Sequence, residues 1–515
     1  MKRGLSRRSF MKAAAIGSGA IALGGSVNVR RAHAHGPHAT SPNNTVPAYV
    51  LPSTGGVSIT PILTVGDHAD NGYRMVGIPD GLGAYRHHDT FELFMNHELG
   101  ATAGIVRAHG SKGAFVSRWT IDRRNFRVIE GRDMTPSPAH VFQWNPVTQQ
   151  YVAGTTAWSR LCSADLPDEK ALRHGNRGTD ERLFCDGEEV TGGRAWARIA
   201  TGPNAGQAWQ LPRLGTMAYE NVVACPHGKD KTIVALTDDA NVLTAGIAAN
   251  NPSEVYIYVG EKQRHGSEIE RAGLTNGKFH GVRVRRHGVV VKEESDQFGL
   301  GDATTGYVGR ARFELVELGD DGDVSALTSP QLEQQSIDND VFRVQRPEDS
   351  AWDPRGSGKD ALYFVTTASI SPLRNSRLWR LTFDDIDRPE RGGHIEILVT
   401  NSEGRMFDNI TIDRLGRVLL QEDTGNNPYI SKIRLYGIDD ESLTEIAHHD
   451  PDLFEPGGAH FITQDEESSG IIDAHDILGE GWFLFDVQVH LASPDPELVE
   501  GGQLLAMHVH PRIGR

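Results

Sequence analysis

Cysteine is scarce in this chain of 515 residues, which contains three: Cys162, Cys185 and Cys225. Three thiols form at most one disulfide, so at least one thiol is left over. No two of them are spaced as Cys-x-x-Cys, which argues against a thiolate zinc site and against a thioredoxin-like redox site. The fold therefore cannot depend on more than one disulfide.

Positive charge is also in short supply. The chain has 52 Lys and Arg residues against 68 Asp and Glu residues, and its formal net charge is −16 at pH 7. Nucleic-acid binding needs a basic footprint, so this balance argues against a nucleic-acid partner. The acidic excess suits a protein that holds several hard cations on carboxylates, and it suits plain solubility equally well.

Apolar runs are short outside the N-terminal region. There, SRRSFMK (6–12) presents Arg7 and Arg8, followed by the apolar stretch AAAIGSGAIALGG and the small-residue cleavage site Ala32-His33-Ala34. This order predicts a twin-arginine export signal over residues 1–34. A short buried helix is the alternative, since the run is too short and Gly-rich to span a membrane.

An export signal of this kind predicts several further properties. The twin-arginine machinery would be a partner, the protein would be periplasmic or secreted, and the mature form would have no membrane span. The same route translocates folded proteins, so it suits chains that take up a metal or cofactor before they leave the cytoplasm.

Several familiar catalytic motifs are missing. The sequence has no G-x-S-x-G elbow, no G-x-x-x-x-G-K-[ST] loop and no H-E-x-x-H helix. The Gly-rich stretch at 299–309 has no strand-to-helix context and indicates a loop. Adjacent histidine pairs at 87–88 and 448–449 fit surface positions better than a regular metal-ligand spacing.

The body of the chain has the texture of a β protein. Residues 35–56 are rich in His, Pro, Ser and Asn and predict a linker or irregular N-terminal arm. From residue 57 to 515, short β-rich runs alternate with Gly, Asp, Asn and Pro, so we expect one domain with few and short helices. The clearest runs are KTIVALTDD (231–239), EVYIYVG (254–260), ALYFVTT (361–367), RLWRLTFDD (377–385), HIEILVT (394–400) and RVLLQED (417–423).

Several of these runs share a local form in which a turn with Asp or Pro and Gly precedes an apolar strand and acidic residues. Examples are CPHGKDKTIVALTDD, WDPRGSGKDALYFVTT and IDRLGRVLLQED. Such a unit, repeated without a fixed period, predicts an all-β single β-propeller with irregular insertions. A jelly roll or a large sandwich is the alternative architecture.

Acidic and amide side chains gather beside these strands. Carboxylate and amide oxygens in such numbers favour Ca²⁺ or another hard cation, although a solvated strand end explains any single group. The groups are NHE (96–98), DGEE (186–189), Glu220, Asp238 with Asp239, Glu348 with Asp349, DN (408–409), Glu422 with Asp423, and Glu466 with Glu467.

The order of these groups resembles that of the PhoX-type alkaline phosphatases and related phytase-like proteins, which also carry twin-arginine signals. NHE, a lone Cys before an EE pair, a Glu-containing strand, RPE, and DN before a D-x-x-G-R strand follow one another over most of residues 57–490. The resemblance implies a six-bladed β-propeller whose channel holds iron and calcium and hydrolyses phosphate monoesters. It would make Cys162, Glu220 and Glu348 iron ligands, Glu98, Glu188, Glu189 and Asp408 the calcium side, and Arg346 the residue that meets the phosphate.

The residue types agree with that chemistry. A phosphomonoester dianion needs positive charge at its non-bridging oxygens, which a planar guanidinium offers as a bidentate fork. In VQRPEDSAWDP (344–354), Arg346 would face substrate and Glu348 a metal, with Pro347 fixing the turn. Two other functions stay open: a calcium-stabilised propeller that binds a partner without catalysis, which the long charged loop after Cys162 favours, and a hydrolase of another ester or lactone.

Overall fold

The computed structural model describes residues 40–239, 252–294, 309–356, 360–367, 376–399, 405–423 and 425–514. Strands dominate these residues, and the longest helix, α5 (Ser329–Asp338), has ten residues. The other helical turns are α2 (Glu169–Leu172), α3 (Glu268–Arg271), α6 (Pro451–Phe454), α7 (His475–Leu478), η1 (Pro138–His140), η2 (Pro212–Leu214) and η3 (Pro389–Arg391). The prediction of a mostly β chain with few, short helices is confirmed. The export signal at 1–34 lies outside the described residues, and the domain boundaries stay predictions.

Two four-stranded antiparallel sheets lie next to each other. The first has the order β3-β4-β5-β6, with β3 (Pro79–His87), β4 (Thr90–His97), β5 (Phe115–Asp122) and β6 (Val128–Asp133). The second has the order β2-β31-β30-β29, with β2 (Val57–Thr64), β29 (Glu466–Asp473), β30 (Trp482–Val489) and β31 (Gly501–Val509). Because β2 pairs with β31, this second sheet joins early and late parts of the chain.

A five-stranded sheet joins distant parts of the chain in the same way. Its order is β1-β28-β27-β26-β25, with β1 (Val50–Pro52), β25 (Phe407–Ile412), β26 (Arg417–Glu422), β27 (Lys432–Gly437) and β28 (Leu443–His449). Strand β1 pairs with β28, so residues near 50 and near 449 belong to one sheet.

The remaining strands form a continuous series of pairings. It runs from β21 (Pro347–Trp352) through β22 (Ala361–Thr366), β23 (Arg377–Phe383) and β24 (Gly393–Val399) to β19 (Ala311–Glu317) and β17 (Lys278–Arg286). It continues through β16 (Pro252–Glu261), β15 (Lys231–Asp238), β14 (Thr216–Ala224), β12 (Leu183–Ile199), β13 (Ala208–Gln210), β7 (Val141–Asn145) and β8 (Gln150–Ala153). Strands β9 (Leu161–Asp165), β18 (Val289–Val291) and β20 (Arg343–Gln345) pair beside this path, while β10 (Arg173–His174) and β11 (Arg177–Gly178) form a separate hairpin. All six apolar runs singled out in the sequence overlap these strands or β26, and the last residue of the run 394–400 lies outside the described residues.

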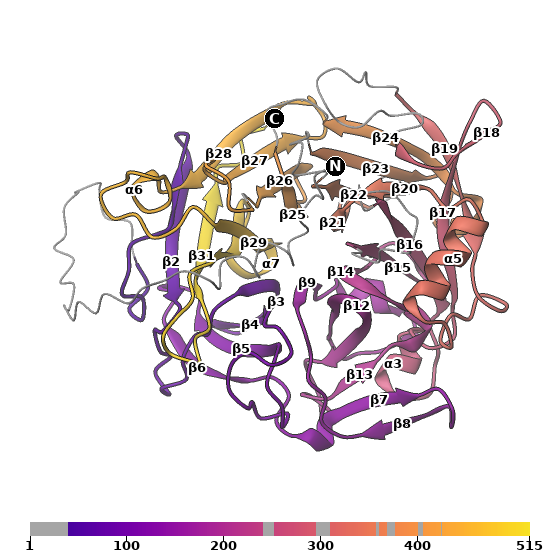
Figure 1. Cartoon of the computed structure of the whole chain (residues 1–515), viewed down its shortest axis with the longest axis horizontal. Helices are drawn as coiled ribbons and strands as arrows, with labels where there is room; N and C mark the ends of the chain where they lie inside the picture. Colours follow the sequence, from indigo (N-terminus) through magenta and orange to yellow (C-terminus); the bar gives the residue numbers. More distant parts are fainter. Residues whose placement is uncertain are drawn as a thin grey trace, which may run out of the picture.

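The sheets are arranged around a common centre, as Figure 1 shows. Six strands lie nearest to it, and each contacts the next in a closed circle: β3, β9, β14, β21, β25, β29 and back to β3. Apolar side chains fill the space between neighbouring sheets; Tyr363 and Val365 of β22, for example, belong to the same buried cluster as Ile412 and Leu420. This propeller-like arrangement brings the inner strands of distant segments to one place.

The entrance to each central strand is built in the same way. A carbonyl at or near its start accepts a hydrogen bond of 2.7–3.1 Å from a backbone N–H in the neighbouring strand or directly after that strand. We call the accepting residues the entry positions: Ile78, Arg160, Ala218, Arg346, Met406 and Asp465. We call the donating residues the outer positions: Glu98, Glu189, Asp239, Thr367, Asp423 and His490.

Two residues after each entry position comes an inner position. The inner positions are Asp80, Cys162, Glu220, Glu348, Asp408 and Glu467. At five of the six, the pairing with the neighbouring strand shifts register, which marks β-bulges in β3, β9, β14, β21 and β25. A bulge re-aims side chains locally, so the six strands can present their inner positions to the same centre.

Candidate metal centre

The inner and outer positions supply a continuous band of buried acidic groups. Four groups of potential ligand atoms lie within 4.8 Å of one another: Asp80–Glu98–Cys162, Cys162–Glu189–Glu220, Glu220–Glu348–Asp408, and Asp408–Asp423–Glu467. Successive groups share Cys162, Glu220 and Asp408, so the band passes without a break across all six central strands. We call these nine residues the acidic band.

Hydrogen bonds tie the members of the band to one another. The Cys162 Sγ lies 3.3 Å from the Asp80 Oδ2 and 3.2 Å from the Glu220 Oε1. Gln488 reaches across from β30 and donates its amide to Asp80 at 3.1 Å and to Glu98 at 3.0 Å. These contacts join β3, β9, β14 and β30, which are far apart in the sequence.

Polar side chains beside the band hold its carboxylates in place. The Ser163 Oγ donates to Glu220 over 2.9 Å and accepts from the Asn409 amide over 2.6 Å. Thr367 fills the outer position next to Glu348 and donates its hydroxyl to that carboxylate over 2.8 Å. A band held in this way is preorganised, because its ligand atoms do not have to be gathered when a cation binds.

The electrostatics of the band favour bound cations. Burial, and then the negative charge of Glu98, raises the pKa of Asp80 well above its ordinary value. Burial and then Glu348 do the same to the pKa of Glu220. Burial, reinforced by Asp80, also raises the pKa of the Cys162 thiol well above its ordinary value. A divalent cation reverses these penalties, because it gives each ionised oxygen or sulfur a positive partner.

The donor set also fits such cations. The Asp80 Oδ1 is buried and has no hydrogen-bond partner among the described residues, which is costly for a polar atom unless a ligand satisfies it. Eight of the nine members of the band offer carboxylate oxygens, the donors that Ca²⁺ prefers. The ninth, Cys162, offers the thiolate that a transition metal such as iron binds.

Two arginines at entry positions border the acidic band. Arg346 forms a fork with Asp239, with Nε 3.1 Å and Nη2 2.8 Å from the two oxygens, and its Nη2 lies 2.7 Å from Glu348. Arg160 bridges Glu98, at 2.5 Å, and Glu189. Both residues have a left-handed backbone, with φ of 55° at Arg346 and 50° at Arg160. The guanidiniums therefore hold fixed positive charge against the band, as His490 does at the outer position beside Glu467, 3.5 Å from its carboxylate.

Comparison with solved structures identifies the fold. PhoX from Pseudomonas fluorescens, solved with vanadate, a transition state analogue, superposes with a TM-score of 0.63 at 11% identity, over 92% of this chain and 98% of that one. The chain shares the PhoX fold. A Dyadobacter fermentans protein of unknown function (TM-score 0.40, 9% identity, 88% and 100% of the two chains) is much less similar. So is a GH62 arabinofuranosidase from Coprinopsis cinerea (TM-score 0.34, 9% identity, 89% and 98%). No protein-family model matches the sequence, and no curated protein does so either.

On this PhoX fold, the structure brings together most of the residues singled out in the sequence. Glu98, Cys162, Glu189, Glu220, Glu348 and Asp408 all belong to the acidic band. Arg346 lies beside it through Glu348. All three cysteines are free and buried, and Cys162 is the one that joins the band.

Glu188 lies outside the band. Its carboxylate pairs with Arg194 at 2.6 Å and accepts from the Ser159 N–H at 3.2 Å. Successive side chains of a strand point to opposite faces, so β12 can present only one of its two adjacent glutamates to the centre. The structure presents Glu189.

Asp80 was missed in the sequence, and Asp423 and Glu467 were counted as acidic residues without a role. Asp80 stands alone in PDG (79–81), where a turn explains it equally well. The glycine that follows Asp80 was the second signal in the sequence. The structure explains it, because a Cβ on Gly81 would lie 2.5 Å from the Ala164 backbone nitrogen. That close approach of β3 to β9 brings Asp80 within reach of Cys162.

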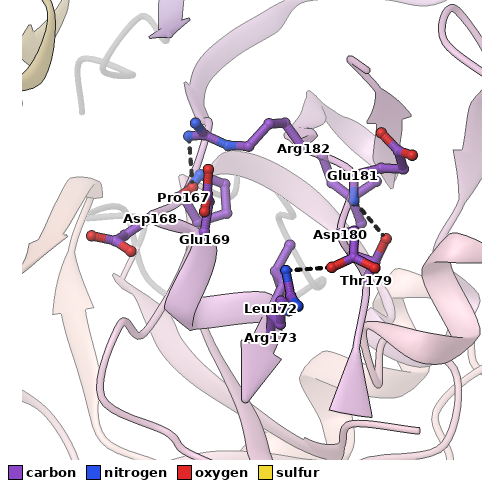
Figure 2. A pocket seen from close by; sticks show the side chains of 10 residues that line it. Pro167, Asp168, Glu169, Leu172, Arg173, Thr179, Asp180, Glu181 and Arg182 are labelled. Carbon is purple, nitrogen blue, oxygen red and sulfur yellow. Dashed lines mark hydrogen bonds and ion pairs between the residues drawn. The ribbon is translucent and has the colours of Figure 1, made fainter. Parts of the chain in front are cut away.

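Two surface hollows lie apart from the band. The hollow between α2 and the start of β12 has a cavity volume of about 10 Å³, and ion pairing of Arg173 with Asp180 crosses it (Figure 2). This is room for one water molecule at most. A larger hollow of about 340 Å³ beside Trp144 and Pro330 contains no member of the band. Among the described residues, the groups of potential ligand atoms within 4.8 Å of one another all lie in the band and none lines either hollow.

No helix among the described residues is long and apolar enough to cross a membrane.

Proposed function

We propose that this chain is an exported, metal-dependent phosphatase that hydrolyses phosphate monoesters on a single six-bladed β-propeller. The blade count is supported by the six-fold repeat of entry, outer and inner positions around one circle of strands. Residues 1–34 would direct export by the twin-arginine route, and residues 57–515 would form the catalytic domain.

The observation on which the proposal depends is the acidic band with Arg346 at its border, on a fold shared with PhoX. Glu98, Glu189, Asp408 and their carboxylate neighbours would hold calcium. Cys162, Glu220 and Glu348 would hold iron, since Cys162 adds the one soft donor of the band. Bound cations would supply Lewis-acid chemistry, which neutralises charge on the phosphoryl oxygens and activates water for attack.

The chain's own residues would bind and orient the substrate. The Arg346 guanidinium would donate to the non-bridging oxygens of the phosphoryl group, for which its planar fork has the right geometry. Asp239 holds that guanidinium through two hydrogen bonds, which fixes its plane before substrate arrives. This positioning lowers the entropic cost of reaching the reactive arrangement.

The decisive experiment combines elemental analysis with a phosphatase assay. Protein purified after folding in the cytoplasm should contain iron and calcium and should hydrolyse a chromogenic phosphate monoester, faster with added calcium. The Arg346→Ala variant should keep its metal and lose roughly 100-fold or more in turnover, since a charged donor at developing charge contributes that much.

Two results would contradict this proposal. Calcium without iron, together with no ester hydrolysis, would support a non-catalytic binding propeller. Wild-type turnover of the phosphate ester by Arg346→Ala would show that Arg346 does not meet the substrate.

A further inference from the structure

The six entry positions share one backbone hydrogen bond but differ in side chain, and most of them also share a backbone conformation. Four of them, Ile78, Arg160, Arg346 and Met406, have φ between 50° and 55°. This left-handed conformation is uncommon for residues with a Cβ, and Ile and Met adopt it here as well as Arg does. The backbone therefore does not require arginine at these positions, and the two arginines need a separate explanation.

The two arginines share one kind of contact, and each has a second acidic partner. Each guanidinium pairs with the outer position of the preceding central strand: Arg346 with Asp239 and Arg160 with Glu98. Each also pairs with an acidic residue of its own sheet, Glu348 for Arg346 and Glu189 for Arg160. The first contact is thus repeated at the two positions, whereas the second differs, because Glu348 is an inner position and Glu189 an outer one.

Both arginines reach the same part of the acidic band. Arg160 pairs with Glu189 and Arg346 pairs with Glu348. A carboxylate oxygen of Glu189 and one of Glu348 each lie within 4.8 Å of a carboxylate oxygen of Glu220. Strand β14, which provides Glu220, lies between β9 and β21 in the circle of central strands. The two guanidiniums therefore flank Glu220 from its two sides.

Both arginines are also nearer to solvent than the acids they pair with. The Arg160 side chain is 26% exposed against 6% for Glu98 and 3% for Glu189, and Arg346 is 15% exposed against 1% for Glu348. Solvent therefore reaches these positive groups more than it reaches the carboxylates, so an anion at the band would be closer to them than to most of the buried acids. That arrangement lowers the electrostatic barrier that a buried acidic site presents to an anionic ligand.

We propose that Arg160 is a second substrate-binding residue, which holds the phosphoryl group together with Arg346. This inference rests on the proposed phosphatase function and adds to it a two-arginine clamp for the substrate dianion. The clamp favours a terminal phosphate over an internal diester. A terminal phosphate has three non-bridging oxygens that the two guanidinium groups can share, whereas an internal diester has two. The alternative is that Arg160 acts only as a counter-ion for Glu98 and Glu189.

The test measures binding of inorganic phosphate to the metal-loaded protein by calorimetry. Arg160→Gln should weaken phosphate binding by roughly tenfold to a hundredfold, the usual effect of losing a charge-assisted hydrogen bond. Its metal content, measured by elemental analysis, should equal that of the wild type, and Arg160→Lys should recover part of the affinity. The KM for a phosphate monoester should rise more in Arg160→Gln than in Arg160→Lys.

Arg380→Gln is the matched control. Arg380 is 25% exposed and pairs with Glu396 at 2.8 Å on β23 and β24, outside the acidic band. This variant should bind phosphate as the wild type does.

The possible outcomes test the two-arginine clamp and the proposed phosphatase function separately. If Arg160→Gln keeps its metal and binds phosphate as tightly as the wild type, the clamp is wrong while the phosphatase can stand. If its affinity falls only in proportion to lost metal, Arg160 is a counter-ion and the clamp is again wrong. If phosphate binding depends on Arg160 but the wild type hydrolyses no monoester, the clamp stands and the phosphatase function fails.

Discussion

Glu348 has two roles that can be separated by changing one atom. Its carboxylate belongs to the group with Glu220 and Asp408, and it also accepts hydrogen bonds from Thr367 and Arg346. A glutamine keeps the size and one acceptor oxygen but loses the negative charge that a cation needs. Residues that only support metal ligands cost roughly 10–100-fold in metal affinity when changed, so a ligand should cost at least as much.

Glu348→Gln should therefore lose bound metal while the metal-free protein stays folded. Removing one charge from a crowded anionic centre relieves repulsion between carboxylates. The metal-free variant should therefore melt at or above the melting temperature of the metal-free wild type. Elemental analysis and thermal melts with and without a chelator measure both effects. Full metal content in the variant would show that Glu348 is not a ligand.

Cys162 should decide which metal the centre holds. Iron binds thiolate well, whereas calcium binds oxygen. Cys162→Ser should therefore lose iron and keep calcium, as measured by elemental analysis. Cys185→Ser is the control, because Cys185 is a buried free thiol outside the band. Unchanged iron in Cys162→Ser, or equal loss in both variants, would argue against a thiolate ligand.

At the scale of the element, the central strands depend on a close approach between backbones. A Cβ on Gly81 would lie 2.5 Å from the backbone nitrogen of Ala164, and backbone cannot move aside as a side chain can. Gly81→Ala should lower the free energy of unfolding by roughly 1–3 kcal/mol, as overpacking does, and should weaken metal binding through Asp80. Gly55→Ala, with nothing within 4 Å of the added atom, should leave both unchanged.

Chemical denaturation and elemental analysis of the two variants give both quantities. If Gly81→Ala is as stable as the wild type and binds as much metal, β3 and β9 do not need this contact.

The strands themselves were predictable, because runs such as ALYFVTT carry the β-branched and aromatic residues that mark strands regardless of what surrounds them. Which of Glu188 and Glu189 points to the centre of the molecule was not predictable. The pairing of β12 with β9 shifts register between Asp186 and Glu188, and a shift of one residue exchanges the two faces of a strand. Nothing local to DGEE marks that bulge, since it depends on the partner strand.

The entry positions were hidden for a related reason. Gly or Asn would have marked a left-handed backbone in the sequence, but Ile78 and Met406 hold it through their surroundings. The six-fold repeat therefore exists in hydrogen bonds and not in residue types. This is why Cys162, Glu220 and Glu348 could be picked out by their resemblance to a known order, while Asp80 and Arg160 could not.

At the scale of the whole molecule, the acidic band couples metal binding to stability. Its carboxylates come from every sheet of the circle, so repulsion within the band pushes all six central strands apart. Bound cations reverse that repulsion and stabilise the folded state in proportion to their binding. Metal removal should therefore lower the melting temperature of the entire chain rather than loosen one part of it.

The effect of pH on the chelated protein follows from its buried carboxyl groups. Burial raises the pKa of Asp165 and of Asp473 to about 7, and raises the pKa of Asp80 and Glu220 well above its ordinary value. A raised carboxyl pKa means that the folded state binds the proton more tightly than the unfolded state does. Its stabilising contribution is complete below the ordinary pKa, about 4, and is lost as the pH rises through the folded value.

Metal-free protein, prepared with a chelator, should therefore melt at a higher temperature at pH 5 than at pH 8. Metal-loaded protein should show the opposite trend, because protons compete with the cations for the carboxylates at pH 5. The gap in melting temperature between the two forms should be wider at pH 8, measured by differential scanning calorimetry with and without a chelator. The Glu348→Gln variant should show a narrower gap at both pH values. An equal gap at pH 5 and pH 8 would mean that the buried acids of the band are not the groups to which the cations bind.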